Sequence, residues 1–160
     1  GDIYSNGALT LTAGRDIVID DNTYVGIDSG SGDLSITAAR NFAIQSTNVT
    51  QAYVYNDGSG DLSITATTGT ISIDGGDPLF ETVETSGGDI NFSSGGAFTF
   101  TSGNILSAAG DITVNAVGIT LDAGTLLDAA DGANTGGQIV LNAGTGAAVL
   151  DGTVGTDHTS

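Results

Sequence analysis

The stretch Gly32-Asp33-Leu34-Ser35-Ile36-Thr37-Ala38 decides the fold, because the chain repeats it at a nearly regular interval. The same seven residues return unchanged at 60–66, and altered copies begin at Gly7, Gly88, Gly110 and Gly137. Successive opening glycines are 25, 28, 28, 22 and 27 residues apart. Self-similarity at such a period is typical of stacked repeats. The sequence therefore predicts a single repeat array over residues 1–160, with rungs that start near 7, 32, 60, 88, 110 and 137.

Each copy of this phrase alternates large apolar residues with Thr, Ser or Asn, as a strand with one buried face does. A second alternating run follows each copy, for example Phe42 with Ile44. A third, noisier run comes next, and in the rung that begins at Gly60 we expect it at Leu79-Phe80. Pro78 would then lie at the start of that strand, where its missing N–H is tolerated.

Three short strands in each turn of roughly 26 residues predict an all-β fold, a right-handed parallel β-helix (β-solenoid) of about six rungs. A β-sandwich also uses short alternating strands, but it does not require one phrase to recur with the same apolar positions. Neither end carries a segment that could cap an open stack, so we expect an uncapped piece of a longer chain or of a filament.

The composition is strongly acidic, with 19 carboxylates against two arginines and a net charge of −17. Such a chain repels nucleic acid and anionic membranes, and it attracts divalent cations. It contains no cysteine, which excludes disulfides, and no apolar run of the length that spans a membrane. These features disfavour nucleic-acid binding and membrane insertion.

Two longer stretches resemble a known family. Gly110-Asp-Ile-Thr-Val-Asn-Ala116, followed by residues 118–130, and the segment 135–143 are similar to filamentous-haemagglutinin-like exoproteins. These are giant bacterial proteins, secreted or at the cell surface, whose shafts are long right-handed β-helices. The resemblance implies that this chain is a non-catalytic shaft segment of an extracellular bacterial fibre or adhesin. Its partners would then be neighbouring repeats of the same parent chain.

Three alternatives remain open at this stage. The chain could self-associate end to end as the subunit of an extracellular filament, or it could be a calcium-stiffened module that binds host or cell-surface glycans. It could also be a polysaccharide-degrading enzyme, since such enzymes use the same scaffold. Catalysis is disfavoured because it needs an isolated set of positioned acids or bases, whereas here the acids repeat in columns.

The acidic residue at the second position of the phrase forms the main candidate site. If the rungs stack in register, these carboxylates lie about 4.8 Å apart. One interpretation is structural, because an Asp after Gly can accept N–H bonds of the turn. The other is a Ca²⁺ site, because oxygen donors in tight turns suit that ion. The candidate ligands are Asp28, Asp33, Asp57, Asp61, Asp89 and Asp111.

Several other residues carry weaker hypotheses. We expect Arg15 and Arg40 to offset nearby acids and the single histidine, His158, to be an exposed residue. Tyr24, Tyr53 and Tyr55 either fill a corner of the core or form an outward aromatic stripe suited to sugar rings. A second column of acids at the end of the second strand is interpreted as a solvated turn position: Asp20, Asp74, Asp122 and Asp151.

Overall fold

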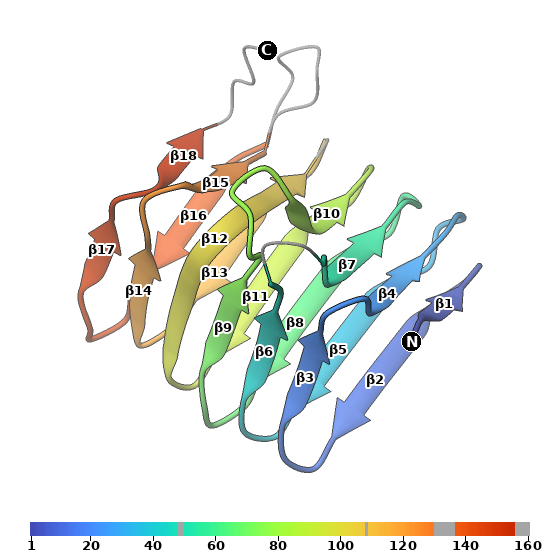
Figure 1. The fold of residues 1–160 in the computed structure, drawn as a ribbon, viewed down its shortest axis with the longest axis horizontal. Coiled ribbons are helices and arrows are strands. Elements are labelled where there is room, and N and C mark those ends of the chain that lie inside the picture. Colours follow the sequence, from blue (N-terminus) through green and yellow to red (C-terminus); the bar gives the residue numbers. More distant parts are fainter. Residues whose placement is uncertain (48–49, 108, 130–136, 156–160) are drawn as a thin grey trace.

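A computed structural model describes residues 1–47, 50–107, 109–129 and 137–155. The regular structure of these residues is β-strand throughout, and the strands coil into a β-solenoid with parallel neighbours (Figure 1). The described residues contain no helix that is long and apolar enough to cross a membrane. The predicted β-helix is therefore confirmed, and a sandwich or barrel is excluded.

The repeated phrase forms one parallel sheet of its own, which we call the phrase sheet. Six strands stack in it, which corresponds to about five turns of the solenoid from the first strand to the last. The strands are β2 (Leu9–Ala13), β5 (Leu34–Ala38), β8 (Leu62–Ala66), β11 (Ile90–Ser94), β13 (Ile112–Asn115) and β16 (Ile139–Asn142).

Two further faces complete each rung. The second face contains β3 (Ile17–Asp20), β6 (Phe42–Gln45), β9 (Ile71–Asp74), the first part of β12 (Ala97–Ser107), β14 (Gly118–Leu121) and β17 (Ala148–Leu150). The third face contains β1 (Ile3–Ser5), β4 (Tyr24–Ile27), β7 (Tyr53–Asn56), β10 (Glu81–Thr85), the last part of β12, β15 (Thr125–Asp128) and β18 (Thr153–Gly155).

The register of the phrase sheet places like residues above one another. Leu34 pairs with Leu9 on one side and with Leu62 on the other, and Ile36 pairs with Leu11 and Ile64. Side chains alternate between the two sides of each strand, so these apolar residues point inward. In β5, β8, β11 and β13 the inward apolar residues are buried. The predicted stacking of the phrase is confirmed residue by residue.

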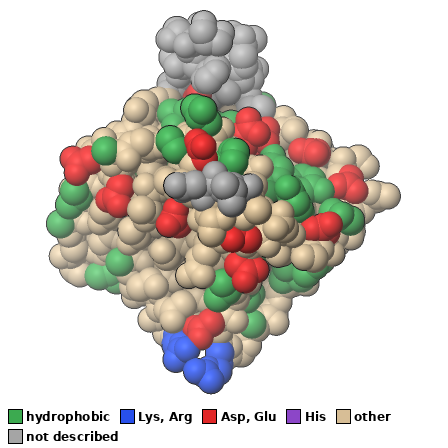
Figure 2. All heavy atoms as spheres, in the orientation of Figure 1, with side chains coloured by type: hydrophobic (Ala, Val, Ile, Leu, Met, Phe, Trp, Pro, Cys, Tyr) green, Lys and Arg blue, Asp and Glu red, His purple; other side chains and the backbone are tan. Residues whose placement is uncertain are grey.

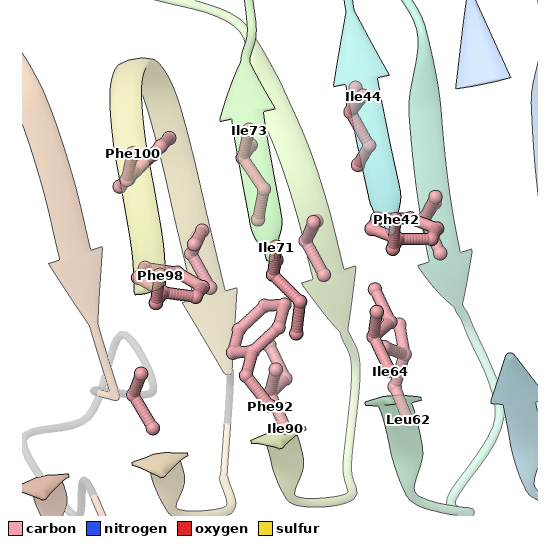
Figure 3. Close-up of a cluster of buried hydrophobic side chains, with 14 of the residues drawn as sticks. Phe42, Ile44, Leu62, Ile64, Ile71, Ile73, Ile90, Phe92, Phe98 and Phe100 are labelled. Carbon is pink, nitrogen blue, oxygen red and sulfur yellow. The ribbon is translucent and has the colours of Figure 1, made fainter. Parts of the chain in front are cut away.

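The core is a continuous apolar column between the three faces (Figure 3). Its largest fully buried side chains are four phenylalanines, and Phe92 packs on Phe98 with ring centroids 5.1 Å apart. Inward positions of the last rung are less covered, since Leu150 keeps 48 % of its surface exposed although it pairs with Leu121. An inward-pointing residue of the core is therefore fully buried only when a rung lies on each side of it.

The third strand of the rung that begins at Gly60 differs from the prediction. Leu79 is 82 % exposed, and it lies with Pro78 in a turn in which the N–H of Phe80 donates to the carbonyl of Asp77 at 3.1 Å. The strand is β10, and Val83 supplies its inward residue by pairing with Val54. The prediction was wrong because Pro78 fixes the turn before the strand and does not begin the strand.

Glycine opens the phrase because adjacent rungs approach backbone to backbone there. A Cβ on Gly60 would overlap the carbonyl oxygen of Gly32, and a Cβ on Gly88 would overlap that of Gly60. Gly110 and Gly137 face the preceding glycine in the same way. A larger residue at this position would push neighbouring rungs apart.

Candidate functional site

The phrase aspartates form a ladder that links the rungs. Each carboxylate accepts the backbone N–H at the same position of the next rung, so we call the set the aspartate ladder. The N–H groups of Asp61, Asp89, Asp111 and Gln138 donate to Oδ1 of Asp33, Asp61, Asp89 and Asp111, at 3.0, 3.0, 2.8 and 2.7 Å respectively.

This ladder gives the acidic column a structural explanation. A hydrogen bond from N–H to a carboxylate is worth about 1.5–3 kcal/mol, and solvent reduces that value at an exposed site. Repulsion between adjacent carboxylates costs about 1 kcal/mol in water, so the two effects are similar in size and opposite in sign. The acceptor role expected for these aspartates is present, but the donor belongs to the following rung and not to the residue's own turn.

A shorter ladder of the same kind lies at the corner between the phrase sheet and the second face. Oδ1 of Asp16 accepts the N–H of Asn41 at 3.1 Å, and Oδ1 of Asn41 accepts the N–H of Thr70 at 3.0 Å. Arg40 also forms a bidentate ion pair with Asp16, in which Nε of Arg40 donates to Oδ1 of Asp16 at 2.8 Å. The guanidinium of Arg40, together with the Asn41 N–H, holds the pKa of Asp16 well below its usual range.

Arg40 therefore offsets an acid, as the sequence suggests, whereas for Arg15 the structure shows only its alignment with Arg40. The N–H of Arg40 donates to the carbonyl of Arg15 at 2.9 Å, so the two residues lie at equivalent places in adjacent rungs. In Figure 2 the basic side chains gather at one corner of the molecule, while acidic side chains are spread over the rest of the visible surface. The chain has no other Lys or Arg.

The six candidate calcium ligands do not come together. Four form the aspartate ladder, whereas Asp28 and Asp57 lie beside the third face, near the tyrosines. Among the residues that the structure describes, no three carboxylate or histidine side chains gather into a group that could hold a metal ion. His158 and the segments 48–49, 108, 130–136 and 156–160 lie outside the described residues.

The tyrosines lie on the outer side of the third face. Tyr24 pairs with Tyr53, and these residues alternate with the inward Val25 and Val54, which are 1 % and 0 % exposed. The rings of Tyr53 and Tyr55 stack at 5.1 Å, and Tyr24 meets Tyr53 edge-on at 6.3 Å. Tyr24 and Tyr53 thus form a partly exposed outward stripe, whereas Tyr55 is buried.

A glycine explains why the ring of Tyr55 is covered although its side chain points outward. Tyr55 pairs with Gly26 in the neighbouring strand, and a Cβ on Gly26 would overlap the ring. The ring therefore lies across β4 where a side chain would otherwise be, and Tyr55 is only 9 % exposed.

Carboxylates fix the phenol groups of this surface. Tyr55 donates its hydroxyl to Asp28 at 2.6 Å, Tyr4 donates to Asp2 at 2.9 Å, and Tyr53 donates to Glu84. Burial and these acceptors raise the pKa values of Tyr53 and Tyr55 well above the usual tyrosine range. Burial, with Glu84 and Asp28 nearby, also raises the pKa of Asp57.

Sequence reasoning missed a buried polar column at the corner between the third face and the phrase sheet. Asn56, Thr85 and Ser107 are fully buried, and they pair in register along β7, β10 and β12. Asn56 donates to the carbonyls of Gly32 and Gly60 at 3.1 and 2.9 Å, and Thr85 donates to that of Gly88 at 2.7 Å. The available signal was a polar residue two places after the inward residue of the third strand.

The second column of acids is interrupted by a bulge. Asp74 pairs with Ser102 and not with Thr101, because the register shifts after Phe100. Ser102 then donates its hydroxyl to Asp74 at 2.7 Å, and the N–H of Gly76 donates to the same carboxylate at 3.0 Å. Like the phrase aspartates, Asp74 is engaged as an acceptor in its turn.

A shallow, open pocket of about 410 Å³ lies at the corner between the phrase sheet and the second face, near the C-terminal rungs. Its lining is uncharged, and Nδ2 of Asn142 donates to Oδ1 of Asn115 at 2.7 Å within it. The lining residues are Ser93, Ser94, Asn115, Ala116, Val117, Asn142, Gly144 and Thr145.

Comparison of the chain with protein-family models, with curated proteins and with solved structures gives no match.

Proposed function

We propose that this chain is a structural segment of a secreted or cell-surface bacterial fibre, in which it provides length and stiffness and catalyses no reaction. The observation that carries the proposal is the aspartate ladder. Its carboxylates are the most regular chemical feature of the sequence, and each one joins a rung to the next. A side chain used in this way at four successive rungs supports extension of the stack.

The core supports the same proposal. Inward residues of adjacent rungs pair like with like, so each rung covers its neighbour and is covered by it. In such an array stability is close to a sum of rung and interface contributions, and length can change by whole rungs. A spacer needs this property, whereas a protein with one specific site would be damaged by the loss of the rung that contains it.

Deletion of one complete rung tests the proposal. Removing residues 60–87 joins Ser59 to Gly88 and takes away β8, β9 and β10 together. Oδ1 of Asp33 can then accept the N–H of Asp89, because both residues occupy the same position of the phrase. We expect a folded β-solenoid that is shorter by about 4.8 Å.

The functional measurement uses the parent fibre in the bacterium that produces it. We expect the deletion to leave the fibre displayed, with its reach reduced by one rung. A control deletion of residues 60–74 removes β8 and β9 but leaves β10, and it should abolish display because β10 then lacks the two strands that complete its turn of the solenoid. If the in-register deletion leaves the fold and display intact but abolishes an attachment or enzymatic activity of the fibre, a purely structural role is wrong.

A further inference from the structure

The outer side of the third face carries all four tyrosines of the chain on three neighbouring strands. Tyr4 lies on β1, Tyr24 on β4, and Tyr53 and Tyr55 on β7. Tyr4 is 54 % exposed, and Tyr24 and Tyr53 are partly exposed. We call this set, with Asp2, Asp28, Asp57 and Glu84, the tyrosine–carboxylate surface.

This surface departs from the repeat. Along the outward column next to Val25 and Val54, the paired residues are Tyr4, Gly26, Tyr55 and Glu84, so each rung differs from the next. The phrase sheet, by contrast, keeps the same residue types at equivalent positions. Stacking alone therefore does not explain this choice of residues, since Gly26 and Tyr55 must fit each other for the ring to lie across β4.

No Lys or Arg side chain offsets the negative charge of this surface. Its phenols already donate to Asp2, Asp28 and Glu84, and a neutral hydroxyl leaves the charge of a carboxylate in place. The two arginines of the chain lie at the opposite corner, where Arg40 is paired with Asp16. Burial raises the pKa of Asp57, and the nearby carboxylates of Glu84 and Asp28 raise it further.

We propose that the tyrosine–carboxylate surface binds lysine or arginine side chains of an extended segment of a partner protein. Aromatic faces attract such cations, and the nearby carboxylates supply acceptors and the opposite charge. Parallel strands repeat at about 4.8 Å, so basic side chains of an extended segment that crosses the strands would meet one rung after another. A neutral sugar could also stack on the rings, but it would leave the excess negative charge without a partner.

The experiment titrates the 160-residue chain with a short arginine-rich peptide that has no aromatic residue, at physiological ionic strength. The same peptide with citrulline in place of arginine is the neutral control. The chain contains no tryptophan, so its intrinsic fluorescence comes from the four tyrosines of this surface and reports binding there directly. Calorimetry of the same titration supplies the affinity independently of the optical signal.

Two charge variants separate this surface from the acidity of the whole chain. Asp57→Asn with Glu84→Gln removes two charges from the surface and keeps an acceptor for Tyr53. Asp122→Asn with Asp151→Asn removes the same charge elsewhere. We expect the first pair to weaken binding by about tenfold or more and the second pair by less than about threefold, because the attraction falls with distance and salt.

Two ring variants test the aromatic contribution at constant charge. Tyr53→Leu should weaken binding by about two- to fivefold, whereas Tyr53→Phe should retain it, because cation–aromatic attraction needs the ring and not the hydroxyl.

Two outcomes would overturn the proposal. Equal losses of affinity in both pairs of charge variants would mean that the peptide is attracted only by the net charge of the chain. Equal binding of the citrulline peptide would overturn it in favour of a neutral ligand.

Discussion

The aspartate ladder and the tyrosine–carboxylate surface lie on the same stack of rungs, yet their contacts differ in kind. In the ladder, backbone meets backbone through glycine and each carboxylate accepts a main-chain N–H. On the tyrosine–carboxylate surface, side chains meet side chains, and neighbouring rungs contribute different residues along the column that contains Gly26 and Tyr55. The comparison indicates that the repeat is strict where the backbone makes the contact, and is relaxed where side chains can adapt or bind.

The largest effect should come from replacing the ladder glycine Gly88 by alanine, and the same replacement of Gly26 on the tyrosine–carboxylate surface is its matched comparison. In Gly88→Ala the new Cβ meets the carbonyl of Gly60, which cannot move without displacing β8. We expect a loss of about 3 kcal/mol in the free energy of unfolding, or about 10 °C in Tm. In Gly26→Ala the nearest atoms to the new Cβ belong to the ring of Tyr55, a side chain that can rotate away.

Thermal melts, together with near-ultraviolet circular dichroism of the tyrosines, measure this contrast. Gly26→Ala should lower Tm by less than about 4 °C while it changes the tyrosine spectrum strongly. Equal losses of Tm in the two variants would show that the two regions do not differ in rigidity.

A smaller effect is expected from removing one acceptor of the ladder. Asp61→Ala leaves the N–H of Asp89 without its carboxylate, and we expect Tm to fall by about 3 °C, or about 1 kcal/mol. Asp61→Asn keeps an oxygen acceptor and removes repulsion from Asp33, so its Tm should stay close to that of the original chain. A melt in which Asn is as damaging as Ala would assign the effect to charge and not to the hydrogen bond.

Alkaline pH should act on the tyrosine–carboxylate surface and spare the ladder. The pKa values of Tyr53 and Tyr55 are raised in the folded chain, from about 10 when unfolded. The folded state therefore holds the extra protons, and this stability is complete below about pH 10 and is lost as the pH rises further.

A titration followed by phenolate absorbance measures this effect. We expect part of the tyrosine signal to appear only above the usual range, together with unfolding. A single transition of all four tyrosines near pH 10, with the fold retained, would contradict the burial of Tyr55.

The smallest effect should be that of divalent ions on the ladder. Since its carboxylates are separate acceptors, we expect Ca²⁺ and Mg²⁺ at equal ionic strength to raise Tm by similar, small amounts through screening. Melts in EDTA, in millimolar Ca²⁺ and in millimolar Mg²⁺ compare them. A large rise with Ca²⁺ alone would instead show that the acidic residues bind calcium selectively.

The sequence predicted the parts of the fold in which one rung copies another. Leu34 and Leu62 could be aligned because the phrases around them are identical, and the inward alternation of Phe42 and Ile44 follows from period two. The strand β10 could not be aligned in this way. Its inward residue is Val83, and the more apolar pair Leu79-Phe80 before it belongs to a turn.

The candidate site was predicted in its residues but not in its contacts. The aspartates of the phrase were visible as a column, and their acceptor role follows from the chemistry of Asp after Gly. That the donor is the next rung depends on the offset between neighbouring turns, which is a three-dimensional quantity. The bond from Tyr55 to Asp28 joins residues 27 positions apart in adjacent rungs, where the phrase is not repeated, so the sequence held no signal for it.

Identical phrases also create an ambiguity that the fold must resolve. Residues 32–38 and 60–66 have the same sequence, so in the phrase sheet alone a folding chain gains nothing from choosing one over the other. The pairing of Gly26 with Tyr55 distinguishes them, because the ring needs a strand without a side chain at that place. The pairing of Tyr55 with Gly26 thereby favours the native order of these two rungs over a stack in which one turn is skipped.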